Sequence, residues 1–192
     1  MAEVLLFHHA HGLTPGVLEF AGELRRAGHV VHAPDLYEGR VFDVFEEGVA
    51  YAQNVGFGVL AERGRAAADG LPASLVPAGF SLGVLPAQLL AQTRPGAGGA
   101  LLFEACLPVS EFGDTWPEGL PVQIHGMADD PVFTGEGDLD AARALVRSAP
   151  DAELFLHPGD RHLFADSGLP SYDKEAAERL LGHTLAFLAR LA

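Results

Sequence analysis

A serine with a glycine two residues to either side is the feature of this sequence best suited to chemistry. Ser81 lies in Gly-Phe-Ser-Leu-Gly, residues 79–83, between the apolar run Leu75–Ala78 and an apolar stretch of helical character. A sharp strand-to-helix turn strains the backbone at its tip, and only glycine fits easily beside it. Such a nucleophile elbow exposes the hydroxyl beside backbone N–H groups that can hold an oxyanion. The pattern predicts a nucleophile, with a merely capping serine as the alternative.

A serine hydroxyl is a weak nucleophile until a base takes its proton, so Ser81 needs a histidine and an acid from other loops. His162 follows the last expected strand, and Asp129 follows the strand before it. The chain order Ser, Asp, His is the order of α/β-hydrolases and not of the other well-known serine triads. We therefore predict the catalytic triad Ser81, Asp129 and His162. Asp130 is the rival acid, which could instead cap the segment that follows it.

The oxyanion donors should come from two places. The backbone N–H of Leu82 is one, and the loop after the first strand should supply the other. That loop contains His8, His9 and His11, which invite a metal-binding interpretation. A zinc site needs further ligands, and no H-E-x-x-H or cysteine-pair pattern occurs. We therefore expect no metal and no organic cofactor, and histidines that line the crevice or bind loop backbone groups.

Composition limits the class of protein. The chain has 192 residues, 48% of them hydrophobic, which fits one domain spanning residues 1–192. The formal net charge of -14 disfavours nucleic acid and anionic membranes as partners. One cysteine excludes an intramolecular disulfide, and the N-terminus lacks a signal-peptide pattern. We expect a cytoplasmic protein with a small-molecule partner, and the sequence leaves the oligomeric state open.

Short apolar runs alternate with helical patterns along the chain, which predicts right-handed βαβ crossovers and a three-layer α/β fold with a mostly parallel sheet. A helix should start after Thr14 at Pro15, another should run from about Val44 to Ala68, and the last should begin near Asp173. The irregular segment Leu107–Pro121 could form a wall or lid over the site. The expected strands are Val4–His8, Val30–Ala33, Leu75–Phe80, Ala100–Cys106, Val122–His125 and Glu153–Leu156.

Several residues near the expected strand ends are further candidates. Glu104 would be an acid inside a buried strand, where it should pair with a loop histidine or reach solvent. Cys106 fits a small buried hydrophobe better than a nucleophile. Candidates for the substrate pocket, with ordinary core or lid packing as the alternative, are His9, Tyr37, Phe112, Trp116 and Phe164.

The chain resembles the dienelactone hydrolase family of α/β-hydrolases over almost its whole length. The resemblance implies a compact version of the α/β-hydrolase fold, and it places Ala10 where the family's second oxyanion N–H lies. Leu13 is the rival position from the wider superfamily. The motifs that carry the resemblance are Pro34–Tyr37, Gly79–Gly83, Gly126–Asp129 and His162–Phe164.

Three departures from that family argue against a dienelactone substrate. Ser81 stands in place of the founding members' cysteine, His9 in place of a glutamate, and Asp166 in place of an arginine that grips the substrate carboxylate. We expect a serine hydrolase that cleaves a small, uncharged ester or lactone through an acyl-enzyme. The alternatives are an acyltransferase with the same triad and a non-catalytic small-molecule-binding member of the fold, which triad geometry would separate from an enzyme.

Overall fold

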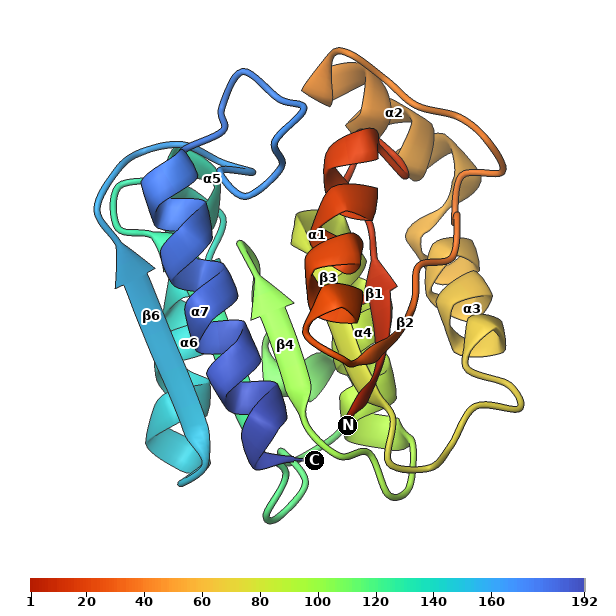
Figure 1. Ribbon diagram of the computed structural model, residues 1–192, viewed down its shortest axis with the longest axis vertical. Helices are drawn as coiled ribbons and strands as arrows, with labels where there is room; N and C mark the ends of the chain where they lie inside the picture. Colours follow the sequence, from red (N-terminus) through yellow and green to blue (C-terminus); the bar gives the residue numbers. More distant parts are fainter. Residues whose placement is uncertain (192) are drawn as a thin grey trace.

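A single parallel sheet of six strands organises the molecule. The computed structural model describes residues 1–191, and the strand order is β2-β1-β3-β4-β5-β6 with every neighbouring pair parallel. All the strands point toward one edge of the sheet, and both chain termini lie at the opposite edge (Figure 1). The strands are β1 (Glu3–Phe7), β2 (Val30–His32), β3 (Val76–Phe80), β4 (Ala100–Phe103), β5 (Val122–Met127) and β6 (Ala152–His157).

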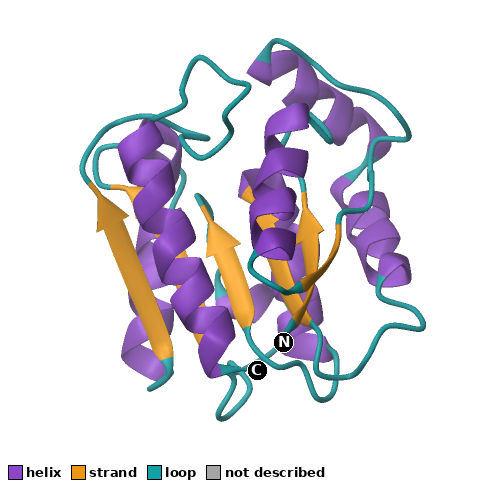
Figure 2. Ribbon diagram, viewed as in Figure 1, coloured by secondary structure: helices purple, strands orange, loops and turns teal. Residues whose placement is uncertain are grey.

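Helices cover both faces of this sheet, so the expected three-layer fold is confirmed (Figure 2). Two of them, α1 (Pro15–Arg26) and α7 (Lys174–Arg190), pack on one face through a core that includes Phe20, Leu180 and Phe187. The other face carries a second core, which includes Leu60, Leu90 and Leu145. Its helices are α3 (Phe57–Ala67), α4 (Val84–Thr93) and α6 (Asp138–Ser148). The short α5 (Pro131–Gly135) precedes α6, and α2 (Phe45–Val55) lies at the end of the sheet to which the strands point.

The helix starts follow the local sequence. The Thr14 side chain accepts a hydrogen bond from the Val17 N–H, and Pro15 occupies the first turn of α1. Asp173 caps α7 in the same way through the Ala176 N–H. Both starts agree with the expected capping signals, in which a side-chain oxygen satisfies an N–H that has no partner within the helix.

Three details of the fold differ from the sequence-based expectation. The helix expected over Val44–Ala68 is two helices, because Gly56 adopts a φ of 96° between them. The strand expected over Ala100–Cys106 ends at Phe103, because Glu104 takes a left-handed φ of 63°. Helix α5 was not expected, and it begins where Asp130 caps Pro131.

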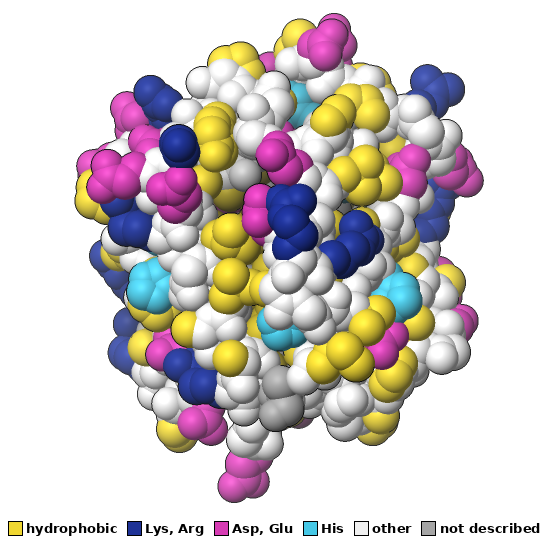
Figure 3. Space-filling view, viewed as in Figure 1, with side chains coloured by type: hydrophobic (Ala, Val, Ile, Leu, Met, Phe, Trp, Pro, Cys, Tyr) yellow, Lys and Arg dark blue, Asp and Glu magenta, His cyan; other side chains and the backbone are white. Residues whose placement is uncertain are grey.

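The surface over α1 and α7 shows Lys and Arg side chains interspersed with Asp and Glu (Figure 3). This distribution on the face shown accompanies the formal net charge of -14. Among residues 1–191, no helix combines the length and the apolar character needed to cross a bilayer.

Candidate active site

The turn between β3 and α4 has the geometry of a nucleophile elbow. Ser81 adopts a φ of 47°, a strained value for a residue with a side chain, at the start of a short 3-10 turn, Ser81–Gly83. A Cβ on Gly79 would collide with the Gly83 carbonyl, and a Cβ on Gly83 would collide with the Phe7 and His8 carbonyls. Both glycines are therefore required by backbone contacts, as the sequence pattern predicts.

Ser81 lies beside a histidine that is oriented by a buried carboxylate. The Ser81 Oγ is 2.9 Å from His162 Nε2, and His162 Nδ1 is 2.7 Å from Asp130 Oδ2. Because the carboxylate accepts the Nδ1 proton, the neutral imidazole leaves Nε2 free to accept the Ser81 hydroxyl proton. Ser81 and His162, which are 81 residues apart in sequence, are therefore within hydrogen-bond distance, as expected for a nucleophile and its base.

The prediction that Asp129 orients the histidine is wrong, and the rival Asp130 has that position. The Asp129 N–H bonds to the Gly159 carbonyl at 2.9 Å, which continues the pairing between the ends of β5 and β6 and leaves the residue exposed. Asp130 is fully buried. Its Oδ1 caps α5 through the Val132 N–H at 2.9 Å while its Oδ2 contacts His162, so capping and orienting are not alternatives.

The charged groups around His162 favour the protonated form of its side chain. Burial lowers the pKa of His162, but the hydrogen bond that it donates to Asp130 and the charges of Glu104, Asp130 and Asp138 outweigh burial. The net result is a pKa raised above 6.5. An imidazolium that forms at His162 during proton transfer is therefore stabilised.

The two expected oxyanion donors line the same cavity as Ser81. This cavity has a volume of about 520 Å³, and both Ala10 and Leu82 contribute to its wall. The Leu82 N–H belongs to the first turn of a helical segment, where no acceptor exists within the helix. Within residues 1–191 the Ala10 N–H has no hydrogen-bond acceptor. Leu13, the rival donor, instead packs against the core beneath α1 and α7.

The rest of the cavity lining is apolar except for four carboxylates. Phe45 of α2 lies edge-on to the His162 ring, with ring centroids 5.6 Å apart. None of the described residues that line it is Lys or Arg. The remaining lining residues are Val49, Ala52, Phe57, Val84, Leu85, Glu104, Ala105, Leu107, Glu111, Val132, Glu136 and Asp138.

None of the five residues predicted to bind substrate lines this cavity. Tyr37 is buried and donates its hydroxyl hydrogen to the Gly48 carbonyl. Trp116 packs in the core and donates its ring N–H to the Leu120 carbonyl. Phe164 belongs to the other core, and Phe112 is half-buried in the loop after the turn Val109–Glu111. Loop position alone did not distinguish core aromatics from cavity aromatics.

His9, the fifth, makes a buried pair with Asp166. The two side chains are 2.7 Å apart, and Asp166 also accepts the Thr14 hydroxyl hydrogen at 2.5 Å. Burial lowers the pKa of His9 despite this carboxylate. The two positions that depart from the family pattern by a histidine and an aspartate therefore contact each other rather than the cavity.

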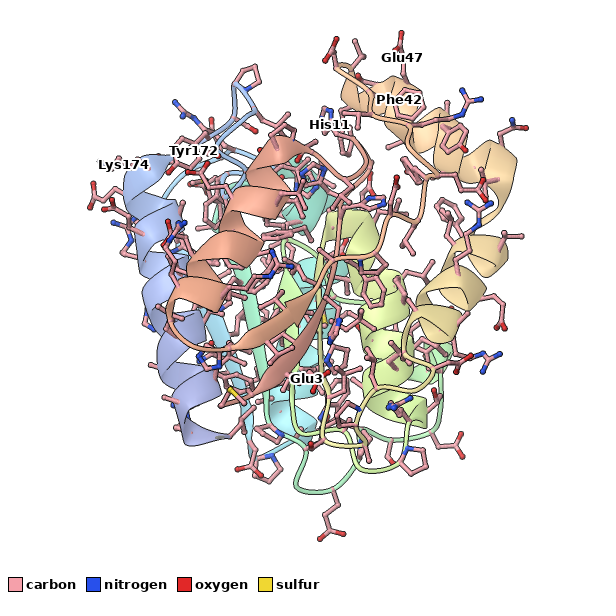
Figure 4. The ribbon with its side chains drawn as sticks, turned by 45° about the vertical axis from the view of Figure 1, so that its right-hand side comes forward. Glu3, His11, Phe42, Glu47, Tyr172 and Lys174 are labelled. Carbon is pink, nitrogen blue, oxygen red and sulfur yellow. The ribbon has the colours of Figure 1, made fainter. Side chains whose placement is uncertain are left out.

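Two histidines of the loop after β1 form hydrogen bonds with backbone carbonyl groups. His11 Nδ1 lies 2.7 Å from the Phe42 carbonyl, and Figure 4 shows His11 at the same end of the molecule as Phe42. His8 Nδ1 lies 2.8 Å from the His9 carbonyl. Among the described residues, no group of three or more His, Cys, Asp or Glu side chains could hold a metal ion.

Glu104 and Cys106 are buried beside the site. Burial raises the pKa of Glu104 to about 7, and among residues 1–191 no side chain forms a hydrogen bond with its carboxyl group. It thus makes neither the histidine pair nor the solvent contact expected from the sequence. Burial raises the pKa of the Cys106 thiol to about 12, which leaves it a poor nucleophile.

Comparison with known proteins identifies a family and proteins of similar fold. Residues 1–192 match the model of the family described as "Dienelactone hydrolase family". A dienelactone hydrolase-like promiscuous phosphotriesterase from metagenomic libraries superposes with a TM-score of 0.76 at 22% identity, covering 100% of this chain and 87% of that one. Esterase 2 of Thermogutta terrifontis, phosphonylated by cyclosarin, superposes with a TM-score of 0.68 at 20% identity, covering 100% and 83%.

A search of curated proteins found no significant match. The two superpositions show the α/β-hydrolase fold, and the family match spans every residue from 1 to 192. The chain belongs to the dienelactone hydrolase family.

Proposed function

We propose that this protein is a serine hydrolase that cleaves a small, uncharged carboxylic ester or lactone through an acyl-enzyme. The observation that carries the proposal is the hydrogen-bonded sequence Ser81, His162, Asp130 at the edge of a cavity of about 520 Å³. A non-catalytic binding protein would not need the strained Ser81 backbone or the orienting carboxylate, each of which has a cost in stability.

The reaction proceeds in two displacements. The Ser81 Oγ attacks the carbonyl carbon while its proton passes to His162 Nε2, and the carbonyl oxygen becomes an oxyanion held by the N–H groups of Leu82 and Ala10. The C–O bond to the leaving alcohol then breaks, and His162 returns the proton to that oxygen. A water molecule attacks the acyl-enzyme, giving its proton to His162. Release of the acid returns this proton to the Ser81 Oγ.

The charge around the cavity supports an uncharged substrate. Glu111, Glu136 and Asp138 line it, and no described lining residue is cationic. An anionic substrate would be repelled both by these side chains and by the net charge of -14. The arginine that grips a substrate carboxylate in the family's founding members has no counterpart here, because Asp166 stands in its place.

Replacing the nucleophile tests the proposal. We expect Ser81→Ala to lower kcat for a neutral 4-nitrophenyl ester by about 10⁴-fold or more, with the fold retained in circular dichroism. Ser110→Ala, which alters an exposed serine outside the cavity, is the matched control and should keep the activity. Undiminished hydrolysis by Ser81→Ala would refute the assignment, and faster cleavage of anionic than of neutral esters would refute the substrate class.

A further inference from the structure

The side chain of His8 holds two backbone groups in different loops. It is fully buried. Its Nδ1 lies 2.8 Å from the His9 carbonyl oxygen, and its Nε2 lies 3.0 Å from the Leu36 backbone nitrogen. The carbonyl can only accept a hydrogen bond and the N–H can only donate one, so the ring must carry its proton on Nδ1.

The His9 carbonyl and the Ala10 N–H belong to the same peptide unit. Because that unit is planar and trans, the two groups point in opposite directions. The carbonyl is held by His8 Nδ1 and also by the Gly12 N–H at 3.0 Å. Two donors on one edge of the peptide therefore fix the direction of the N–H on the other edge.

Contacts on either side of this peptide limit its rotation further. The His11 N–H, one residue after Ala10, is directed at His9 Nδ1 at 3.3 Å. The Ala10 carbonyl packs directly on Gly48 of α2, where any Cβ would collide with it. The Ala10 N–H has no acceptor among residues 1–191, and Ala10 lines the Ser81 cavity.

We propose that His8 is a positioning residue of the oxyanion hole, which fixes the His9–Ala10 peptide so that the Ala10 N–H is directed into the Ser81 cavity. This inference rests on the proposed hydrolase function and adds a role for a residue outside the triad. His8 does not touch the substrate. Its Nδ1–H orients one of the two donors that stabilise the transition state, and it holds the loop at Leu36 through Nε2.

Two substitutions of His8 each keep one of the two hydrogen bonds that its ring forms and remove the other. In His8→Asn, the side-chain amide nitrogen can take the place of Nδ1 and donate to the His9 carbonyl. In His8→Gln, the amide oxygen can take the place of Nε2 and accept from the Leu36 N–H, while the donor to His9 is lost. Each variant loses one buried hydrogen bond, so the two should lose similar thermal stability.

Their kinetics should differ. Loss of an oxyanion-hole donor costs about 10²- to 10³-fold in kcat, and a donor that is only misdirected should cost less. We expect His8→Gln to have a kcat about tenfold or more below that of His8→Asn on the same neutral ester. KM should change little in either variant, because the oxyanion exists only in the transition state.

The outcomes distinguish this inference from the proposed function. Equal kcat values for the two variants, or losses of kcat that only follow their melting temperatures, would overturn the role of His8 while Ser81-dependent hydrolysis by the unaltered protein stands. Absence of any Ser81-dependent hydrolysis would overturn both. The tautomer of His8 in the unaltered protein provides a further test of its positioning role. We expect ¹⁵N NMR of histidine-labelled protein to show His8 protonated on Nδ1. Protonation on Nε2 alone would contradict the proposed hydrogen bond to the His9 carbonyl.

Discussion

Asp130 performs two tasks with one buried carboxylate. Its Oδ1 caps α5 and its Oδ2 orients His162, so the start of the helix and the catalytic base are fixed by the same side chain. The sequence signal for this residue was the Asp-Pro pair, in which an aspartate caps a helix that begins with proline. The Asp-Pro pair therefore predicted that Asp130 caps a helix. It did not predict that the second oxygen of the same carboxylate would accept a hydrogen bond from His162.

Substitution of the two neighbouring aspartates tests this assignment. We expect Asp130→Asn to lower kcat by about 10⁴-fold, because an amide favours the wrong histidine tautomer. Asp129→Asn changes an exposed side chain and should alter kcat by no more than about twofold. Steady-state kinetics on a neutral ester provide the comparison, and a larger loss in Asp129→Asn would restore the acid predicted from the sequence.

The raised pKa of His162 predicts the acid side of the pH–rate profile. The base acts only when unprotonated, so kcat/KM should rise with pH and reach half its maximum above pH 6.5, the ordinary histidine value. Because the hydrogen bond that His162 donates to Asp130 is a main cause that raises this pKa, the residual activity of Asp130→Asn should have its midpoint at lower pH. A wild-type midpoint well below 6.5 would contradict the electrostatic description.

At the scale of elements, α2 lies across the end of the sheet to which the strands point, whereas α3 packs on one face of the sheet (Figure 1). The sequence predicted one helix here, because a glycine inside an apolar helical pattern can be tolerated. The break at Gly56 has a tertiary cause that the local pattern does not contain: α2 must contact the Ala10 loop through Gly48, while α3 buries Leu60 in the core.

Two glycine substitutions test this contact. Gly48→Ala would force a Cβ against the Ala10 carbonyl, and we expect a loss of about 1–3 kcal/mol in the free energy of unfolding together with lower kcat. Gly182→Ala in α7 meets nothing within 4 Å and should raise stability by about 0.5–1 kcal/mol at unchanged kcat. Denaturant unfolding measures both. A Gly48→Ala protein as stable and active as the original would show that the loop can shift freely.

The strands and their order along the chain could be predicted because parallel strands buried on both faces leave continuous apolar runs. The contact between Ser81 and His162 could be predicted because the position of each residue relative to a strand end is a local feature of the sequence. The cavity lining could not, because it depends on how α2 and the segment around residues 104–111 pack over the sheet. Phe45 and Asp138, for example, lie in helices whose sequence patterns reveal only which faces are buried.

At the scale of the whole molecule, several histidines are buried in the neutral form. Burial lowers the pKa of His8 and of His157 to about 4, and it also lowers the pKa of His9 and His125. A group with a depressed folded-state pKa is unprotonated in the fold and takes up a proton on unfolding. These histidines therefore stabilise the fold above pH 6.5, and that contribution declines as pH falls toward 4.

We expect the melting temperature to fall between about pH 7 and about pH 5, a range in which most carboxylates stay ionised. Glu104, whose pKa is raised to about 7, and His162, whose pKa is raised above 6.5, have the opposite effect and favour the fold at lower pH, but these two groups oppose four histidines. Calorimetry over this range measures the effect. A melting temperature that rises on acidification would show that these histidines are protonated in the folded protein.

We propose Ser81 as the activated nucleophile of this site. The most direct test of this proposal is intact-protein mass spectrometry after reaction with a fluorophosphonate, followed by peptide mapping of the adduct. The account predicts a single adduct on Ser81, none in Ser81→Ala, and much slower labelling in Asp130→Asn. The absence of an adduct on the folded protein, or an adduct on any other residue, would contradict it.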